Sequence, residues 1–103
     1  MAGHGDSPNV IEHLQVRLDR RHRTAAVAGQ PLSLTGTEFR LLEVLLGNIG
    51  ETFSRPQLVQ AVIAGGAVVL ERTIDVHICA LRRKLGTANV IETVRGAGYR
   101  IPL

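Results

Sequence analysis

Residues 71–85 read Glu-Arg-Thr-Ile-Asp-Val-His-Ile-Cys-Ala-Leu-Arg-Arg-Lys-Leu, and Gly86 follows them. At 100° per residue, the aliphatic side chains of this stretch fall on one stripe, which consists of Ile74, Ile78, Leu81 and Leu85. The opposite face is basic and carries small groups: Arg72, Val76, Cys79 and Arg83, flanked by Thr73, Ala80 and Lys84. The stretch therefore predicts a helix that packs on a core through one stripe and ends at Gly86.

Two further helices are predicted upstream of this one. Thr35 and Glu38 have the spacing of a capping box, and the apolar run 39–46 is too long for a solvated helix. This first helix should stop at residues 47–50, because Gly and Asn there favour left-handed conformations. The second helix should start at Ser54, with Pro56 in its first turn and Gln57 at its third position, and should run to about residue 64. Residues 65–70 are then a loop between helices.

Extended segments are predicted at both ends of the chain. Residues 10–18 alternate loosely and indicate one or two strands, the charged stretch 19–23 is a turn, and short strands are expected at 24–27 and 32–34 around turn residues 29–31. Residues 90–94 and 99–101 are predicted to pair as a hairpin across the glycine-rich turn 95–98. The pattern predicts a small antiparallel N-terminal sheet and a C-terminal hairpin with Arg95 at its tip.

Length and composition bound the class of protein. The chain has 103 residues, enough for one domain, with 45% hydrophobic but only 3% aromatic residues, a net charge of +3 and a pI near 10.0. A lone Cys79 and the lack of zinc-site spacing favour a reducing compartment, and we expect a cytoplasmic protein without metal or cofactor. Neither a membrane-spanning run nor a signal peptide is recognisable. Residues 1–9 are interpreted as a disordered lead, and residues 10–103 as the domain.

The helix at 71–85 and the C-terminal hairpin together have the chemistry of a surface that binds duplex DNA. A major groove of about 12 Å admits one α-helix, so small side chains at Cys79 and Ala80 permit close approach and Val76 can touch a thymine methyl. Arginines at the edges, such as Arg83, can reach phosphates or guanine. The guanidinium of Arg95 suits the narrow, electronegative minor groove.

Four stretches resemble one known family. Residues 34–42 are similar to its first-helix signature, 53–58 to its second helix, 72–85 to its recognition helix and 91–100 to its wing. On these residues the chain is identified as a member of the OmpR/PhoB-type winged-helix effector domains of two-component response regulators. The resemblance implies an α+β fold with an N-terminal four-stranded antiparallel sheet, three helices and a C-terminal β-hairpin wing. It also implies binding to promoter DNA, usually as tandem protomers on direct repeats.

The resemblance also implies roles for individual residues. It implies phosphate contacts from Arg72, Thr73, His77 and Arg82. It implies base contact from Val76, and minor-groove insertion by Arg95 with support from Thr93 and Tyr99. Many relatives have long polar side chains where this chain has Cys79 and Ala80, which leaves the target sequence open. The loop 65–70 lacks the frequent aromatic residue, which argues against contact with RNA polymerase, and a phosphorylatable receiver domain is absent from these residues.

The same residues argue against other functions. His77 and Asp75 are two apart and point in different directions on a helix, which argues against a metal or acid–base pair. The same angle separates Cys79 from His77 as nucleophile and base, and Gly96 and Gly98 are turn glycines rather than a phosphate loop. We therefore do not expect an enzyme. The main alternative is a winged helix that uses the same face to bind an acidic protein.

Overall fold

The computed structural model describes residues 9–103, so the predicted disordered lead lies, apart from Asn9, outside the described residues. Four antiparallel strands come first in the order β1-β2-β3-β4, namely β1 (Val10–His13), β2 (Val16–Asp19), β3 (Thr24–Val27) and β4 (Gln30–Leu32). Three helices follow, α1 (Gly36–Leu46), α2 (Arg55–Ala64) and α3 (Ile74–Leu85), with short 3-10 turns η1 (Glu71–Thr73) and η2 (Gly86–Ala88) on either side of α3. The chain ends in the hairpin β5 (Glu92–Val94) and β6 (Gly98–Arg100). The predicted α+β architecture is confirmed.

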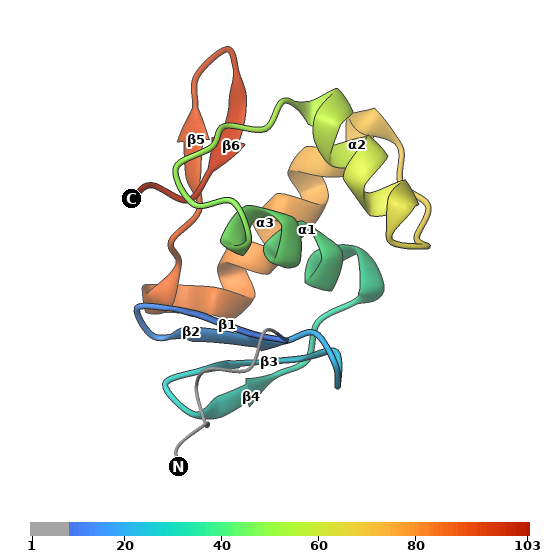
Figure 1. Cartoon of the computed structure of the whole chain (residues 1–103). Helices are drawn as coiled ribbons and strands as arrows, with labels where there is room; N and C mark the ends of the chain where they lie inside the picture. Colours follow the sequence, from blue (N-terminus) through green and yellow to red (C-terminus); the bar gives the residue numbers. More distant parts are fainter. Residues whose placement is uncertain (1–8) are drawn as a thin grey trace.

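The elements form two layers with the hairpin projecting beyond them. The N-terminal sheet lies under the helices, and β5 and β6 stand at the far end of the molecule (Figure 1). The inner face of the sheet contributes Val16, Leu18 and Ala25 to the core, and these side chains are buried against the apolar faces of the helices. Burial of this aliphatic surface is the main favourable term that holds the two layers together.

Both predicted helix starts are confirmed. Thr35 accepts the Glu38 backbone N–H and Glu38 accepts the Thr35 N–H, and Ser54 and Gln57 make the same reciprocal pair at α2. The helix α1 ends where we predicted, but the left-handed cap that we gave as the reason was wrong. Gly47 caps α1 with a right-handed φ of −74°, and the left-handed residue is Gly50, three positions later.

The strands of the N-terminal sheet depart from the predictions at both hairpin turns, and β4 covers 30–32 rather than the predicted 32–34. Leu14 does not continue a strand: it has a φ of +56°, is 76% exposed and turns the chain between β1 and β2. Pro31 is not a turn residue but lies in β4, where it pairs with Ala26. Proline is tolerated there because β4 is an edge strand, where one side of the backbone needs no ladder partner. The chain reverses instead at Ala28 and Gly29, which both have positive φ.

The third helix follows its prediction closely, whereas the hairpin strands are 92–94 and 98–100 rather than 90–94 and 99–101, with Gly98 in β6 and not in the turn. Ile74, Ile78, Leu81 and Leu85 are all buried, as the stripe predicted, although residues 71–73 form a 3-10 turn rather than α-helix. The hairpin has one further partner that sequence reasoning missed, because Phe53 forms an antiparallel bridge with Tyr99. Within residues 9–103, no helix is long and apolar enough to cross a membrane.

Candidate nucleic-acid interface

The outer face of α3 is exposed along its length. Val76 is 65% exposed, Cys79 and Arg83 are exposed, and Ala80 is half-buried. With Asp75 they line a shallow hollow on this face. The small side chains of this face leave room for a partner surface to approach α3 closely.

Three cations of this region carry no neutralising partner. Among residues 9–103, carboxylates pair with Arg55, Lys84 and Arg100, but no ion pair involves Arg72, Arg83 or Arg95. All three side chains are exposed. Unpaired surface guanidinium groups attract phosphate, because the guanidinium fork matches the geometry of phosphate oxygens.

Residues at the start of α3 have more constrained positions. The Thr73 hydroxyl donates to the Leu70 carbonyl at 2.8 Å, which fixes the 3-10 turn but leaves the hydroxyl oxygen able to accept. His77, in the first turn of α3, is half-buried.

The other end of α3 is basic. Arg82, Arg83 and Lys84 fall in its last turn, where positive charge is favoured by the helix dipole.

The hairpin presents Arg95 at its turn. Glu92, Thr93 and Val94 of β5 pair with Arg100, Tyr99 and Gly98 of β6, and the Ala97 N–H donates to the Val94 carbonyl to close the turn. Arg95 and Thr93 are exposed. The arginine tip predicted from the sequence is therefore present and accessible.

Side chains of α3 bind both strands of this hairpin. Arg82 Nη2 donates to Thr93 Oγ1 of β5 at 2.6 Å, and the Tyr99 hydroxyl of β6 donates to Asp75 Oδ1 at 2.5 Å. Arg55 Nε of α2 donates to the same Asp75 oxygen at 2.8 Å. Tyr99 itself is only 5% exposed, so its predicted part in DNA binding can only be indirect support.

Hydrogen bonds and burial within this network shift three pKa values. The hydrogen bond from Arg55, and next that from Tyr99, lower the pKa of Asp75 below its ordinary value. Burial, and next the bond to Asp75, raise the pKa of Tyr99, and the bond to Asp75 raises that of Arg55. Asp75 is therefore ionised and Tyr99 protonated at neutral pH, which is the state that supports the three-element contact.

Sequence reasoning missed the roles of Asp75 and Arg55. It placed Asp75 only in a rejected metal pair with His77, and it assigned Arg82 to phosphate contact. The contacts join residues 11, 20 and 24 positions apart, which no local pattern reveals. The helix-turn-helix of α2 and α3, followed by a hairpin fastened to α3, defines the winged-helix class of domains.

Comparison with known families places the chain within that class. The family model described as "Transcriptional regulatory protein, C terminal" matches residues 29–101. The chain belongs to this family, the OmpR/PhoB-type effector domains of response regulators, as the four sequence stretches indicated.

Curated relatives are similar over most of this chain. The phosphate regulon transcriptional regulatory protein PhoB of Pseudomonas aeruginosa is 40% identical over 100 residues, which cover 95% of this chain and 44% of the relative. PhoB of Rhizobium meliloti is 44% identical over 101 residues, covering 91% of this chain and 44% of the relative. The chain thus spans less than half the length of these relatives.

Solved structures share the fold over most of this chain. The DNA-binding domain of CpxR from E. coli is 37% identical with a TM-score of 0.77, covering 93% of this chain and 97% of that one. The Klebsiella pneumoniae RstA DNA-binding domain, solved in complex with the RstA box, is 26% identical with a TM-score of 0.76, covering 90% and 96%.

Proposed function

We propose that this domain binds duplex promoter DNA sequence-specifically, as the output domain of a response-regulator-type transcription factor, with α3 in the major groove and the wing in the adjacent minor groove. The observation that carries the proposal is the set of unpaired, exposed guanidinium groups: Arg72 in η1 just before α3, Arg83 on α3, and Arg95 on the wing that is hydrogen-bonded to α3. The similar RstA domain binds its own DNA box, which supports the same use here.

Each predicted site residue except Arg82, which is bonded to Thr93 of the wing, has a role on DNA in this proposal. Val76, Cys79 and Ala80 approach base edges in the major groove, where their small size allows α3 to sit deeply. Phosphates are contacted by side chains on and before α3: Arg72, Thr73, His77 and Arg83. Arg95 enters the minor groove, with Thr93 and Tyr99 supporting the strands that present it.

The wider partners of the proposal come from the family. A receiver domain in a longer chain agrees with the relatives, which are more than twice as long as the matched region, and tandem protomers on direct repeats are inferred from the family resemblance. A cytoplasmic location and the lack of enzymatic activity are part of the same proposal. Contact with RNA polymerase is left out of it, because loop 65–70 has no aromatic side chain.

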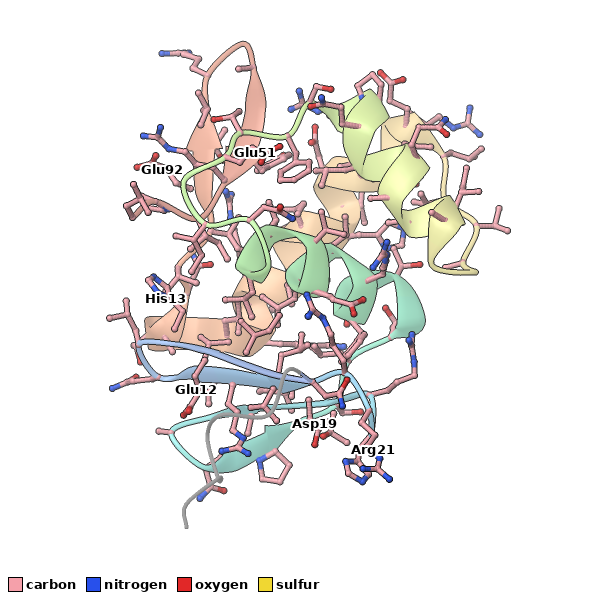
Figure 2. All side chains as sticks on the ribbon, viewed as in Figure 1. Glu12, His13, Asp19, Arg21, Glu51 and Glu92 are labelled. Carbon is pink, nitrogen blue, oxygen red and sulfur yellow. The ribbon has the colours of Figure 1, made fainter. Side chains whose placement is uncertain are left out.

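The experiment begins with selection of a binding site from random-sequence duplexes by the purified domain. Arg95→Ala should then weaken binding to the selected duplex roughly tenfold, as loss of a base-region arginine contact does. Arg21→Ala is the matched control, since Arg21 lies in the turn between β2 and β3, at the opposite end of the molecule from the wing (Figure 2). No enrichment in the selection, with unchanged amide signals across residues 72–83 when DNA is added, would instead support binding of an acidic protein.

A further inference from the structure

We propose that Asp75 and Arg82 are positioning residues: they form a seam that fixes the wing to α3, and Arg82 is thereby withdrawn from the phosphate contact that the family resemblance implies. The proposal rests on the proposed function, because it concerns how the same surface meets DNA. The seam is defined here as the two bonds Asp75–Tyr99 and Arg82–Thr93.

The seam follows from the spacing of its two helical residues. Residues 75 and 82 are seven apart, which is two helical turns, so their side chains leave α3 in nearly the same direction and about 10 Å apart along the axis. Asp75 reaches β6, and Arg82 reaches β5. Two separated bonds, one to each strand, restrain both the position and the tilt of the hairpin, which a single bond cannot do.

The direction of the seam also places the wing beside the DNA-facing side of α3. At 100° per residue, residues 75 and 82 lie roughly 100–120° around the helix axis from Val76, between the exposed face and the buried stripe. The wing therefore stands next to the outer face of α3 rather than behind the helix. Arg95 at the tip of the wing can therefore enter the minor groove while Val76 faces the adjacent major groove.

Contacts of the Arg82 side chain leave little of it available to phosphate. Nη2 is bonded to Thr93, the guanidinium carbon lies 5.2 Å from the centre of the Tyr99 ring, and Nε is buried without a hydrogen-bond partner among the described residues. A guanidinium stacked on a buried ring and bonded at one edge is a packing element. By contrast Arg83, the next residue, is exposed.

Asp75 joins a third element to the seam. A carboxylate on the DNA-facing helix would repel phosphate, but Arg55 of α2 neutralises it and stacks over the same Tyr99 ring, with the guanidinium carbon 5.5 Å from the ring centre. The Tyr99 backbone is also hydrogen-bonded to Phe53 through the antiparallel bridge. The wing therefore has its angle set by α2, α3 and the segment between α1 and α2 together.

The functional consequence is that the seam sets the distance between the major-groove and minor-groove contacts. Loosening it should leave the fold and α3 intact but free the wing, so that the Arg95 contact is lost. The variant Thr93→Val/Tyr99→Phe tests this, because it removes only two hydroxyl groups and keeps the ring, the volume and every charge. Thr87→Val is the matched control, since Thr87 is exposed in η2 and outside the seam.

The measurement is a double-mutant cycle on the selected duplex, with thermal unfolding recorded for each protein. In the parent background, which retains Arg95, the double variant Thr93→Val/Tyr99→Phe should weaken binding roughly tenfold. In the Arg95→Ala background it should change affinity by less than about twofold. The amides of residues 95–97 should also show lower order parameters in the free protein. Thr87→Val should change none of these quantities.

The possible outcomes separate this inference from the proposed function. If the double variant weakens binding equally with and without Arg95, or leaves affinity unchanged while Arg95→Ala weakens it, the seam does not position the wing and the inference is wrong. If Arg82→Gln instead lowers the salt dependence of binding as Arg83→Gln does, Arg82 contacts phosphate after all. If the parent domain selects no duplex, it is the proposed function that fails.

Discussion

Glu38 serves two elements with one buried carboxyl group. Its Oε1 accepts the Thr35 backbone N–H at 2.9 Å, which closes the capping box of α1, and accepts Lys84 Nζ of α3 at 2.6 Å. Burial alone would raise the pKa of this carboxyl, but the bonds from Lys84 and Thr35 outweigh burial and lower the pKa below its ordinary value. The ionised form is therefore the one that stabilises the contact between α1 and α3.

Lys84→Met should lower the free energy of unfolding by about 1–2 kcal/mol near neutral pH, because it leaves a buried carboxylate without its cation. The pKa of Glu38 is lower in the folded parent than its ordinary value of 4.5. The ion pair with Lys84 therefore contributes fully to the free energy of unfolding above pH 4.5, and this contribution is lost as the pH falls through the folded pKa. The deficit of the variant should therefore shrink in acid. Urea unfolding between neutral and acidic pH measures it.

The control for that variant is the adjacent Arg83→Met, which removes a cation that has no carboxylate partner among residues 9–103. Its stability should stay within about 0.5 kcal/mol of the parent at every pH. Equal losses for the two variants would mean that the bond to Glu38 contributes nothing measurable.

Cys79 offers a direct probe of the outer face of α3. It is the single cysteine of the chain and is exposed, with Arg83 Nη2 3.8 Å from its sulfur. If α3 enters the major groove, the selected duplex should protect this thiol from alkylation in proportion to the fraction of protein bound. Intact mass after timed iodoacetamide treatment measures the rate, and a scrambled duplex is the control. Equal rates with the two duplexes would place Cys79 outside the interface.

At the scale of elements, the helices were predictable because their signals are local. Thr35 with Glu38 and Ser54 with Gln57 carry each helix start within four residues, and the stripe of α3 is set by helical periodicity alone. The exposed arginine tip of the wing was predictable for the same reason. The use of these residues on DNA stays a prediction.

The parts that sequence reasoning missed depend on contacts between distant segments. Leu14 has the apolar character of a strand residue, yet it adopts a positive φ because the register of β1 and β2 leaves only two residues to reverse the chain. Pro31 lies in a strand because β4 is at the sheet edge, which only the assembled sheet decides. Asp75 acquires its partners from α2 and β6, so no window of sequence around it contains the information.

The wing depends on glycine at one position. Gly98 has a φ of +145°, and a Cβ there would collide with the backbone carbonyl of Phe53, which pairs with the next residue of β6. Gly98→Ala should therefore destabilise the domain by at least about 1–3 kcal/mol, the cost of the strained backbone before the collision is counted. Thermal unfolding should show a clear fall in Tm.

Gly96→Ala is the matched control at the tip of the same hairpin. Gly96 also has a positive φ, +75°, but a Cβ there has nothing within 4 Å. Its cost should be limited to about 1 kcal/mol from the left-handed backbone. The Tm should fall in the order parent, Gly96→Ala, Gly98→Ala, and a reversed order would show that the close approach to Phe53 does not constrain the wing.

At the scale of the whole molecule, exposed positive charge is gathered in two regions. One group consists of Arg72 in η1, Arg83 on α3 and Arg95 on the wing. The other lies in the turn between β2 and β3, where Arg21 projects from the sheet in Figure 2. In that turn Arg20 is paired with Glu43 and His22 with Asp19. The net charge of the domain does not tell which of the two regions contacts DNA, but the salt dependence of binding in variants of each region does.

If α3 and the wing engage roughly four to six phosphates per protomer, log K should fall with log salt at a slope of about −4 to −5, because each neutralised phosphate releases about 0.9 of a counterion. Arg83→Gln should make this slope shallower by about 1. Arg21→Gln removes the same charge from the turn between β2 and β3 and should leave the slope unchanged. Fluorescence anisotropy over a range of salt concentrations separates these variants even where their affinities at one salt are similar. Equal changes in slope would mean that DNA responds to the total charge of the domain, and α3 would then have no special place in binding.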